Sequence, residues 1–203
     1  MITIIDYKTG NIGSILNMLK KIGVEANISS DIKDIKKSDK LILPGVGAFN
    51  TGMENLQQLG LISLLNDEVI NHKKPILGLC LGMQLLARKS EEGNLFGLSW
   101  LDAEVVKFKF DDKNLKIPHM GWNTIIPKRQ SSLLTGLDSD YRFYFVHSYH
   151  FECRDSKDIL ANTFYGYEFP SIVQKGNIYG VQFHPEKSHK FGMKLLKNFA
   201  EFC

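Results

Sequence analysis

The chain has 203 residues, of which 43% are hydrophobic and 23% charged, and its formal net charge is +3. This composition is typical of a globular domain and excludes a disordered or fibrous chain. With 25 basic residues against 22 acidic ones, the charge gives no reason to expect binding to nucleic acid or to membranes. Three cysteines without a C-x-x-C pair argue against a disulfide framework. The first residues lack the pattern of a signal peptide, so a cytoplasmic protein is expected.

The first half of the chain alternates strand-like and helix-like segments. Apolar runs at 2–6 and 41–45 are typical of buried strands, and residues 75–80 predict a third. Apolar spacing predicts helices over 12–22, with Asn11 as N-cap, over 53–71, and from 81 to 87. This alternation predicts a parallel sheet covered by helices.

The second half is richer in strand-forming residues. The segments expected to form strands, a hairpin and a last helix are 103–110, 142–149, 158–165, the hairpin 171–183 and the helix 188–201. Together, the two halves predict one α/β domain over residues 1–203. Its mainly parallel central sheet is flanked by helices and extended by an antiparallel annex.

The sequence GLCLG places Cys80 between Gly78 and Gly82 at a predicted strand-to-helix junction. The same pattern with serine forms the nucleophile elbow of hydrolases. Small residues on both sides allow the tight turn that exposes such a nucleophile. The pattern therefore predicts a nucleophilic thiol. The alternative is that Cys80 is a core residue and that the glycines are incidental.

A nucleophilic thiol needs a base, and His184 is the histidine whose neighbours best suit that role. Pro185 disfavours helix at the residue before it and keeps the segment extended. In an extended chain His184 and Glu186 point to the same side, so the carboxylate can orient the imidazole. These residues predict a Cys80–His184–Glu186 triad. The alternative is a surface His–Glu pair at a turn.

Acyl transfer also requires donors for the developing oxyanion. We expect one from the backbone of Leu81 and another from the loop Gly45-Val46-Gly47, whose glycines permit unusual peptide orientations. The same loop fits a dinucleotide site poorly, because Asn50 stands where a third glycine is needed.

Two histidines, His147 and His150, have a spacing found in some metal sites. No cluster of further ligands accompanies them in the sequence, so we expect no metal. A phosphate-binding GxxxxGK[ST] segment is also missing from the sequence. The chain is therefore expected to work without a cofactor.

Five motifs occur in one order along the chain: PGVGAF (44–49), GLCLGMQLL (78–86), KIPHMGWN (116–123), YFVHSY (144–149) and GVQFHPEKS (180–188). Together they resemble the class I (triad) glutamine amidotransferases. Within that family the chain is most similar to glutaminase subunits of imidazole glycerol phosphate synthase. The resemblance covers nearly the whole chain and implies a flavodoxin-like α/β fold.

The resemblance implies that Cys80 attacks the side-chain amide of L-glutamine, forming a γ-glutamyl thioester and releasing ammonia. His184 would act as base and then acid, oriented by Glu186, before water hydrolyses the thioester. A peptide rotation near Val46 would complete the oxyanion hole. By position in the family motifs, the amino-acid end of glutamine would be held by Gln84, Glu92 and the backbone of Ser148 and Tyr149.

Ammonia released into water is mostly protonated, and this chain has no room for an acceptor site, so a partner subunit is expected. The resemblance implies a (βα)₈-barrel cyclase that makes imidazole glycerol phosphate in histidine biosynthesis, bound as a heterodimer. It places five residues at or near the interface: Asn11, Trp122, Asn123, Tyr144 and Lys187.

Two segments, 6–14 and 186–199, look more like paralogues found beside enzymes of surface-sugar biosynthesis. In particular, Lys8 stands where the family commonly has glycine. A sugar-amidating synthase is therefore an alternative partner. A stand-alone cysteine hydrolase and a non-catalytic binding subunit are further alternatives. The chain matches the amidotransferase subunits in length and contains KIPHMGWN, which argues against a stand-alone hydrolase. The intact triad argues against a non-catalytic binding subunit.

Overall fold

The computed structural model describes residues 1–137 and 141–203. Its main sheet has, in spatial order, the strands β2 (Ala26–Ser29), β1 (Ile2–Ile5), β3 (Lys40–Leu43), β4 (Ile76–Leu79), β13 (Ile178–Val181), β12 (Tyr167–Lys175), β11 (Ile159–Tyr165) and β8 (Ile126–Pro127). The strands from β2 to β13 pair in parallel, and the others join antiparallel. This arrangement confirms the predicted α/β fold with a mainly parallel sheet.

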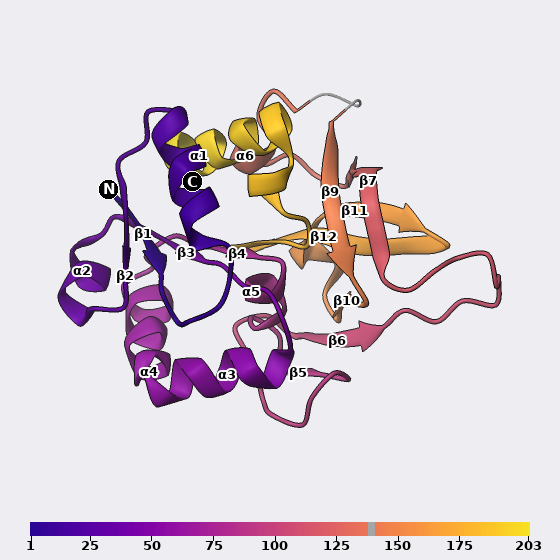
Figure 1. Ribbon diagram of the computed structural model, residues 1–203, viewed down its shortest axis with the longest axis horizontal. Helices are drawn as coiled ribbons and strands as arrows, with labels where there is room; N and C mark the ends of the chain where they lie inside the picture. Colours follow the sequence, from indigo (N-terminus) through magenta and orange to yellow (C-terminus); the bar gives the residue numbers. More distant parts are fainter. Residues whose placement is uncertain (138–140) are drawn as a thin grey trace.

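Helices cover both faces of this sheet (Figure 1). On one face lie α1 (Ile12–Lys21) and α6 (His189–Phe202), which contact each other. On the other face lie α3 (Phe49–Gln58) and α4 (Leu61–Asn66). Within the described ranges, no helix has the length and apolar character needed to cross a membrane.

Successive residues of β3 show how the sheet divides the core. Leu41 and Leu43 belong to the hydrophobic cluster that contains Phe49 of α3, whereas Ile42 belongs to the cluster that contains Ile15 of α1. This alternation follows from the two-residue period of a strand. Each fully buried leucine or isoleucine side chain contributes roughly 1.5–3 kcal/mol of transfer free energy.

Two smaller, mostly antiparallel sheets lie beside the main sheet (Figure 1). A smaller sheet joins β10 (Tyr149–Cys153), β6 (Ala103–Lys107) and β5 (Lys89–Ser90), and β7 (His119–Thr124) pairs antiparallel with β9 (Arg142–His147). The strand predicted over 103–110 ends earlier, at Lys107. The strand predicted over 142–149 is divided between β9 and β10. The hairpin predicted over 171–183 is confirmed by the pairing of β12 with β13.

The helix predicted over 53–71 is not continuous. Gly60 adopts a left-handed conformation, with φ of 66°, and separates α3 from α4. The last turn, η1 (Asp67–Asn71), is a π-helix. Glycine takes a positive φ at little cost, which explains the break. Further short elements are α2 (Ile32–Lys37), α5 (Leu81–Gln84), η2 (Ser132–Leu134), η3 (Ser156–Asp158) and η4 (Pro185–Lys187).

The start of α1 also differs from expectation. Asn11 occupies the N-cap position, but its side chain makes no capping hydrogen bond. Its backbone carbonyl instead accepts from the N–H groups of Ser14 and Ile15. The Asn11 side chain therefore contributes little to this helix end.

Gly82 sets how closely α5 approaches β3. A Cβ atom at this position would lie 1.9 Å from the carbonyl oxygen of Leu43. We expect Gly82→Ala to lower the free energy of unfolding by about 3 kcal/mol or more, because backbone must move to relieve the clash. Urea unfolding followed by circular dichroism measures this change.

Gly13→Ala is the matched control. No atom lies within 4 Å of a Cβ built at Gly13, which is in α1. This change should raise stability by roughly 0.5–1 kcal/mol through helix propensity. Equal stabilities of the two variants would contradict the predicted clash.

Candidate active site

Cys80 stands at a sharp turn between β4 and α5. Its φ of 52° and ψ of −108° are unfavourable for a residue with a side chain, so the turn is strained. The N–H of Cys80 donates to the carbonyl of Val181 at 2.8 Å, which ties the turn to β13. A Cβ on Gly78 would lie 2.7 Å from the carbonyl oxygen of Gly82. The turn therefore requires glycine on both sides of Cys80.

A cavity of about 780 Å³ opens beside Cys80, at the carboxyl ends of the parallel strands β3, β4 and β13. Ligands of parallel α/β sheets bind at this edge. Many residues predicted from the sequence line the cavity: Asn11, Val46, Gly47, Cys80, Leu81, Gln84, Glu92, Ser148, Tyr149, His184 and Lys187.

His184 and Glu186 form a buried pair. The Nδ1 of His184 lies 2.8 Å from Oε1 of Glu186, and both side chains are almost fully buried. Glu186 is in the 3₁₀ turn η4, not in the extended segment that the sequence predicted, yet its carboxylate reaches the imidazole. The N–H of His184 donates to the carbonyl of Tyr144 at 2.9 Å and holds this segment against β9.

The protonation of His184 depends on its neighbours. Burial opposes the charged imidazolium, but hydrogen bonds with Cys80 and Glu186, and the charges of both groups, raise its pKa to about 10. Nδ1 is directed to Glu186, so Nε2 is the ring nitrogen that remains for Cys80. The site therefore holds a proton on His184 at neutral pH.

The loop 45–47 packs against the Cys80 turn. A Cβ on Gly45 would lie 2.7 Å from the backbone nitrogen of Gly82. Gly47 has a φ of 98°, and the Val46 side chain is 46% exposed at the cavity wall. Leu81 is the first residue of α5, where an N–H group has no partner within the helix. Backbone groups from both segments thus surround the space beside Cys80.

The predicted glutamine-binding side chains are held by hydrogen bonds. The Nε2 of Gln84 donates to the carbonyl of Tyr149 at 3.2 Å and to Oε1 of Gln182 at 3.1 Å. The Oε2 of Glu92 accepts from the N–H of Phe49 at 2.8 Å. Both side chains are therefore fixed at the cavity wall.

Sequence reasoning missed Gln182. This residue is fully buried, and its Nε2 lies 3.7 Å from Sγ of Cys80, within hydrogen-bonding range for sulfur. The available signal was its position in GVQFHPEKS, two residues before His184, where strand periodicity points both side chains the same way.

Several residues predicted for a partner interface lie close together, and two of the predicted set, Asn11 and Lys187, line the cavity itself. The ring of Trp122 stacks on His189 at 5.6 Å and meets Tyr144 edge-on at 6.2 Å. The Nζ of Lys187 lies 5.8 Å from the centroid of the Tyr144 ring. Asn123, on the same strand as Trp122, points its amide to the carbonyl of Phe164.

Comparison with known proteins identifies the family. The model of the family "Glutamine amidotransferase class-I" matches residues 3–202. The chain belongs to the class I glutamine amidotransferases.

Full-length relatives narrow the comparison within this family. The chain is 58% identical to "Imidazole glycerol phosphate synthase subunit HisH 2" of Methanococcus maripaludis, over 99% of both chains. It is 50% identical to the protein of the same name from Pseudomonas aeruginosa, over 99% of both chains. A crystal structure described as a glutamine amidotransferase superposes with a TM-score of 0.76 at 20% identity, covering 98% of this chain and 97% of the other.

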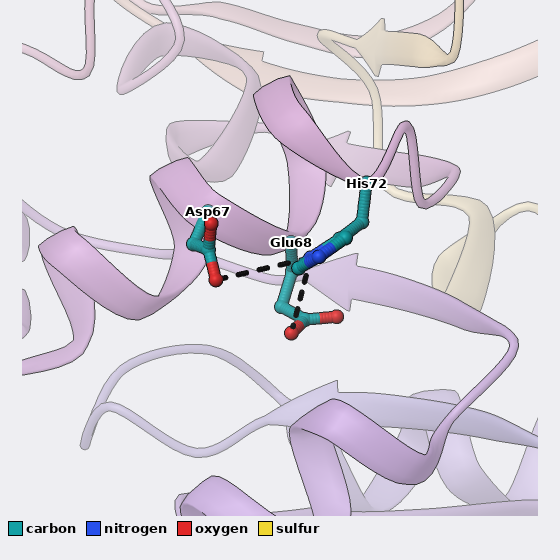
Figure 2. Close-up of side chains that lie close together, drawn as sticks. All are labelled: Asp67, Glu68 and His72. Atoms are coloured by element: carbon teal, nitrogen blue, oxygen red, sulfur yellow. Dashed lines mark ion pairs between the residues drawn. The ribbon is translucent and has the colours of Figure 1, made fainter.

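One acidic cluster lies away from this amidotransferase cavity. Figure 2 shows Asp67, Glu68 and His72 side by side on the last turns of the helical segment, with His72 Nδ1 3.8 Å from Asp67 Oδ2 and 3.7 Å from Glu68 Oε1. The other carboxylate oxygen of Glu68 lies 2.6 Å from Nζ of Lys74. Because this lysine already compensates the buried carboxylate, we assign the cluster a structural role.

The raised pKa of His184 yields a prediction. The ordinary value is 6.5, so the ion pair stabilises the folded chain fully below that pH, and this contribution is lost as the pH rises through about 10. Glu186→Gln should lower the pKa of His184 toward its ordinary value. Glu201→Gln, a change in an exposed i,i+4 pair with Lys197, should leave it unchanged. Titration of the imidazole by NMR measures both, and an unaltered His184 in Glu186→Gln would contradict the assignment.

Proposed function

We propose that this chain hydrolyses L-glutamine to glutamate and ammonia as the glutaminase subunit of imidazole glycerol phosphate synthase. The observation that carries this proposal is that Cys80 and His184 line the cavity at the strand ends, with Glu186 paired to His184 behind it. Membership of the amidotransferase family and 58% identity to a subunit named HisH 2 support it.

In the proposed reaction, Sγ of Cys80 attacks the side-chain carbonyl carbon of glutamine. His184 gives its proton to the amide nitrogen, the C–N bond breaks, and ammonia leaves. A water molecule then attacks the thioester while His184 takes its proton, and glutamate and the thiol are released. Glu186 keeps the imidazole oriented throughout and stabilises its charged form.

The oxyanion of each tetrahedral intermediate needs two donors. We assign one to the N–H of Leu81 and the other to the loop Gly45-Val46-Gly47. The positive φ of Gly47 and the exposed Val46 suit a peptide that rotates when the partner binds.

The amino-acid end of glutamine carries one positive and one negative group. We assign the carboxylate of Glu92 to the ammonium group, because opposite charges form the strongest hydrogen bonds. Gln84 and the backbone of Ser148 and Tyr149 supply further polar groups on the same cavity wall.

The partner would supply the site that consumes ammonia. We propose a heterodimer with a (βα)₈-barrel cyclase that docks over the Trp122–Tyr144–Lys187 cluster and Asn11. Exposed apolar side chains beside the cavity support this: Trp122 is 45% exposed, and Met120, on the same strand, is 61% exposed. The free cysteines fit a reducing, cytoplasmic setting.

A sugar-amidating synthase is the second candidate partner. Lys8 adopts a φ of 66°, a conformation that favours glycine, at the position where the family commonly has glycine.

Glutamate release from glutamine distinguishes these partners. We expect a low rate from the chain alone. The rate should rise about tenfold or more with the barrel cyclase and its nucleotide ligand, because their binding completes the oxyanion hole. A rise only with the sugar-amidating synthase would move the chain to the second pathway. A high rate without any partner would contradict the need for one and favour a stand-alone hydrolase.

Cys80→Ala should reduce glutaminase activity of the stimulated complex by about 1,000-fold or more, because the covalent step is lost. Cys153→Ala is the control: burial and the nearby Asp158 and Asp155 raise the pKa of that thiol to about 12, so it remains protonated. Cys153→Ala should keep full activity. Normal activity of Cys80→Ala would show that another group is the nucleophile.

A further inference from the structure

A row of polar side chains runs from strand β7 to the cavity, and its two histidines, His119 and His147, are buried. Nδ2 of Asn123 lies 3.2 Å from Nε2 of His119. Nδ1 of His119 lies 2.9 Å from Nε2 of His147, and Nδ1 of His147 lies 2.8 Å from the carbonyl oxygen of Tyr149. Both His147 and Tyr149 line the cavity. Neither His119 nor His147 has a role in the expected triad.

Backbone groups at both ends fix the direction of this row. The Oδ1 of Asn123 accepts from the N–H of Thr124 at 2.8 Å, and its Nδ2 donates to the carbonyl of Phe164 at 2.9 Å. The amide of Asn123 is therefore a donor toward His119. At the other end the carbonyl of Tyr149 only accepts.

One set of tautomers satisfies every link. His147 must carry its proton on Nδ1 to donate to Tyr149, which leaves its Nε2 as acceptor. His119 must then also carry its proton on Nδ1, and its Nε2 accepts from Asn123. A second proton on either ring would place two N–H groups against each other. The geometry thus requires two neutral histidines.

The surroundings keep both rings neutral. His119 lies between Phe145 and Tyr165, with ring centroids at 4.8 Å and 4.1 Å. Burial lowers the pKa of His119 to about 4 and lowers that of His147 far below its ordinary value. Burial outweighs the hydrogen bond to the Tyr149 carbonyl, which favours protonation of His147. The titratable side chains that face His147 are His119, His150 and His184, and a charge on any of them would oppose its protonation.

We propose that His147 and His119 are positioning residues for glutamine, and that they form a directed hydrogen-bond chain from Asn123 to the Tyr149 carbonyl. This proposal rests on the proposed glutaminase function and deepens it.

The Tyr149 carbonyl is the point where this chain meets the reaction site. It accepts from His147 and also from Nε2 of Gln84. Gln84 in turn bonds Gln182, whose amide reaches Sγ of Cys80. Loss of the His147 donor would free the Tyr149 peptide, so glutamine binding would weaken more than the chemical step.

The outer end lies on strand β7 (Figure 1). This strand also carries the exposed side chains of Met120 and Trp122. A partner that shifts β7 would therefore act on the glutamine pocket through Asn123, His119 and His147.

Two variants of one residue test the proposal in the stimulated complex. His147→Asn retains a donor where Nδ1 was, whereas His147→Gln retains only a group at the Nε2 position. We expect His147→Gln to raise KM for glutamine by about tenfold, with a smaller change in kcat. His147→Asn should remain within about twofold of the wild type in KM. Equal KM values for the two variants would overturn the proposal.

His150→Gln is the control for burial alone. His150 is another buried histidine, but its ring forms hydrogen bonds with Phe151 and Tyr167 and is not part of the row from Asn123 to Tyr149. This variant should lose stability but keep the wild-type KM. A rise in KM equal to that of His147→Gln would show that any buried histidine matters equally, and would also overturn the proposal.

NMR of ¹⁵N-labelled imidazoles supplies a readout that does not need activity. We expect His119 and His147 to be neutral with the proton on Nδ1 at pH 6, and we expect Asn123→Asp to protonate Nε2 of His119. If both rings carried the proton on Nε2 in the wild type, the proposed hydrogen-bond chain would be overturned. If the wild-type complex releases no glutamate, the proposed function fails. The NMR result still decides whether the hydrogen-bond chain from Asn123 to Tyr149 exists.

Discussion

The turn at Cys80 is the constraint on which the rest of the site depends. The residue is strained, and it persists because Gly78 and Gly82 let α5 pack directly on the strands β3 and β4. A hydrogen bond to Val181 joins the same turn to β13. Strand β4, which leads to Cys80, therefore lies beside β3, which leads to the Gly45–Gly47 loop, and β13, which leads to His184. A change in this packing displaces nucleophile, base and oxyanion loop together.

The histidines around the turn differ in the protonation state that their surroundings favour. On one side, Glu186 and Cys80 favour the charged form of His184 despite its burial. On the other, His119 and His147 lie among aromatic rings without a carboxylate, and they remain neutral. Proton transfer is thus confined to one histidine, while the others can only donate or accept in a fixed direction.

Local spacing made much of this arrangement predictable. Gly78, Cys80 and Gly82 fall within five residues, so the tight turn follows from the local sequence. His184 and Glu186 lie two residues apart, but their pairing is made through a 3₁₀ turn where an extended segment was expected. The row from Asn123 to Tyr149 was not predicted, because it depends on the register that pairs His119 with His147 across β7 and β9. The break at Gly60 was missed because apolar periodicity continues on both sides of it. Contacts between distant segments and positive-φ turns are the features that periodicity does not report.

The place of β13 in the sheet has a consequence for biosynthesis. This strand lies between β4 and β12 in the sheet. In the sequence, however, it comes more than 95 positions after Cys80, which follows its neighbour β4. During translation, the cysteine leaves the ribosome long before Val181 and His184 can reach it. Nascent chains therefore carry Cys80 without His184, and the two residues come together only when the sheet receives its central strand late in synthesis.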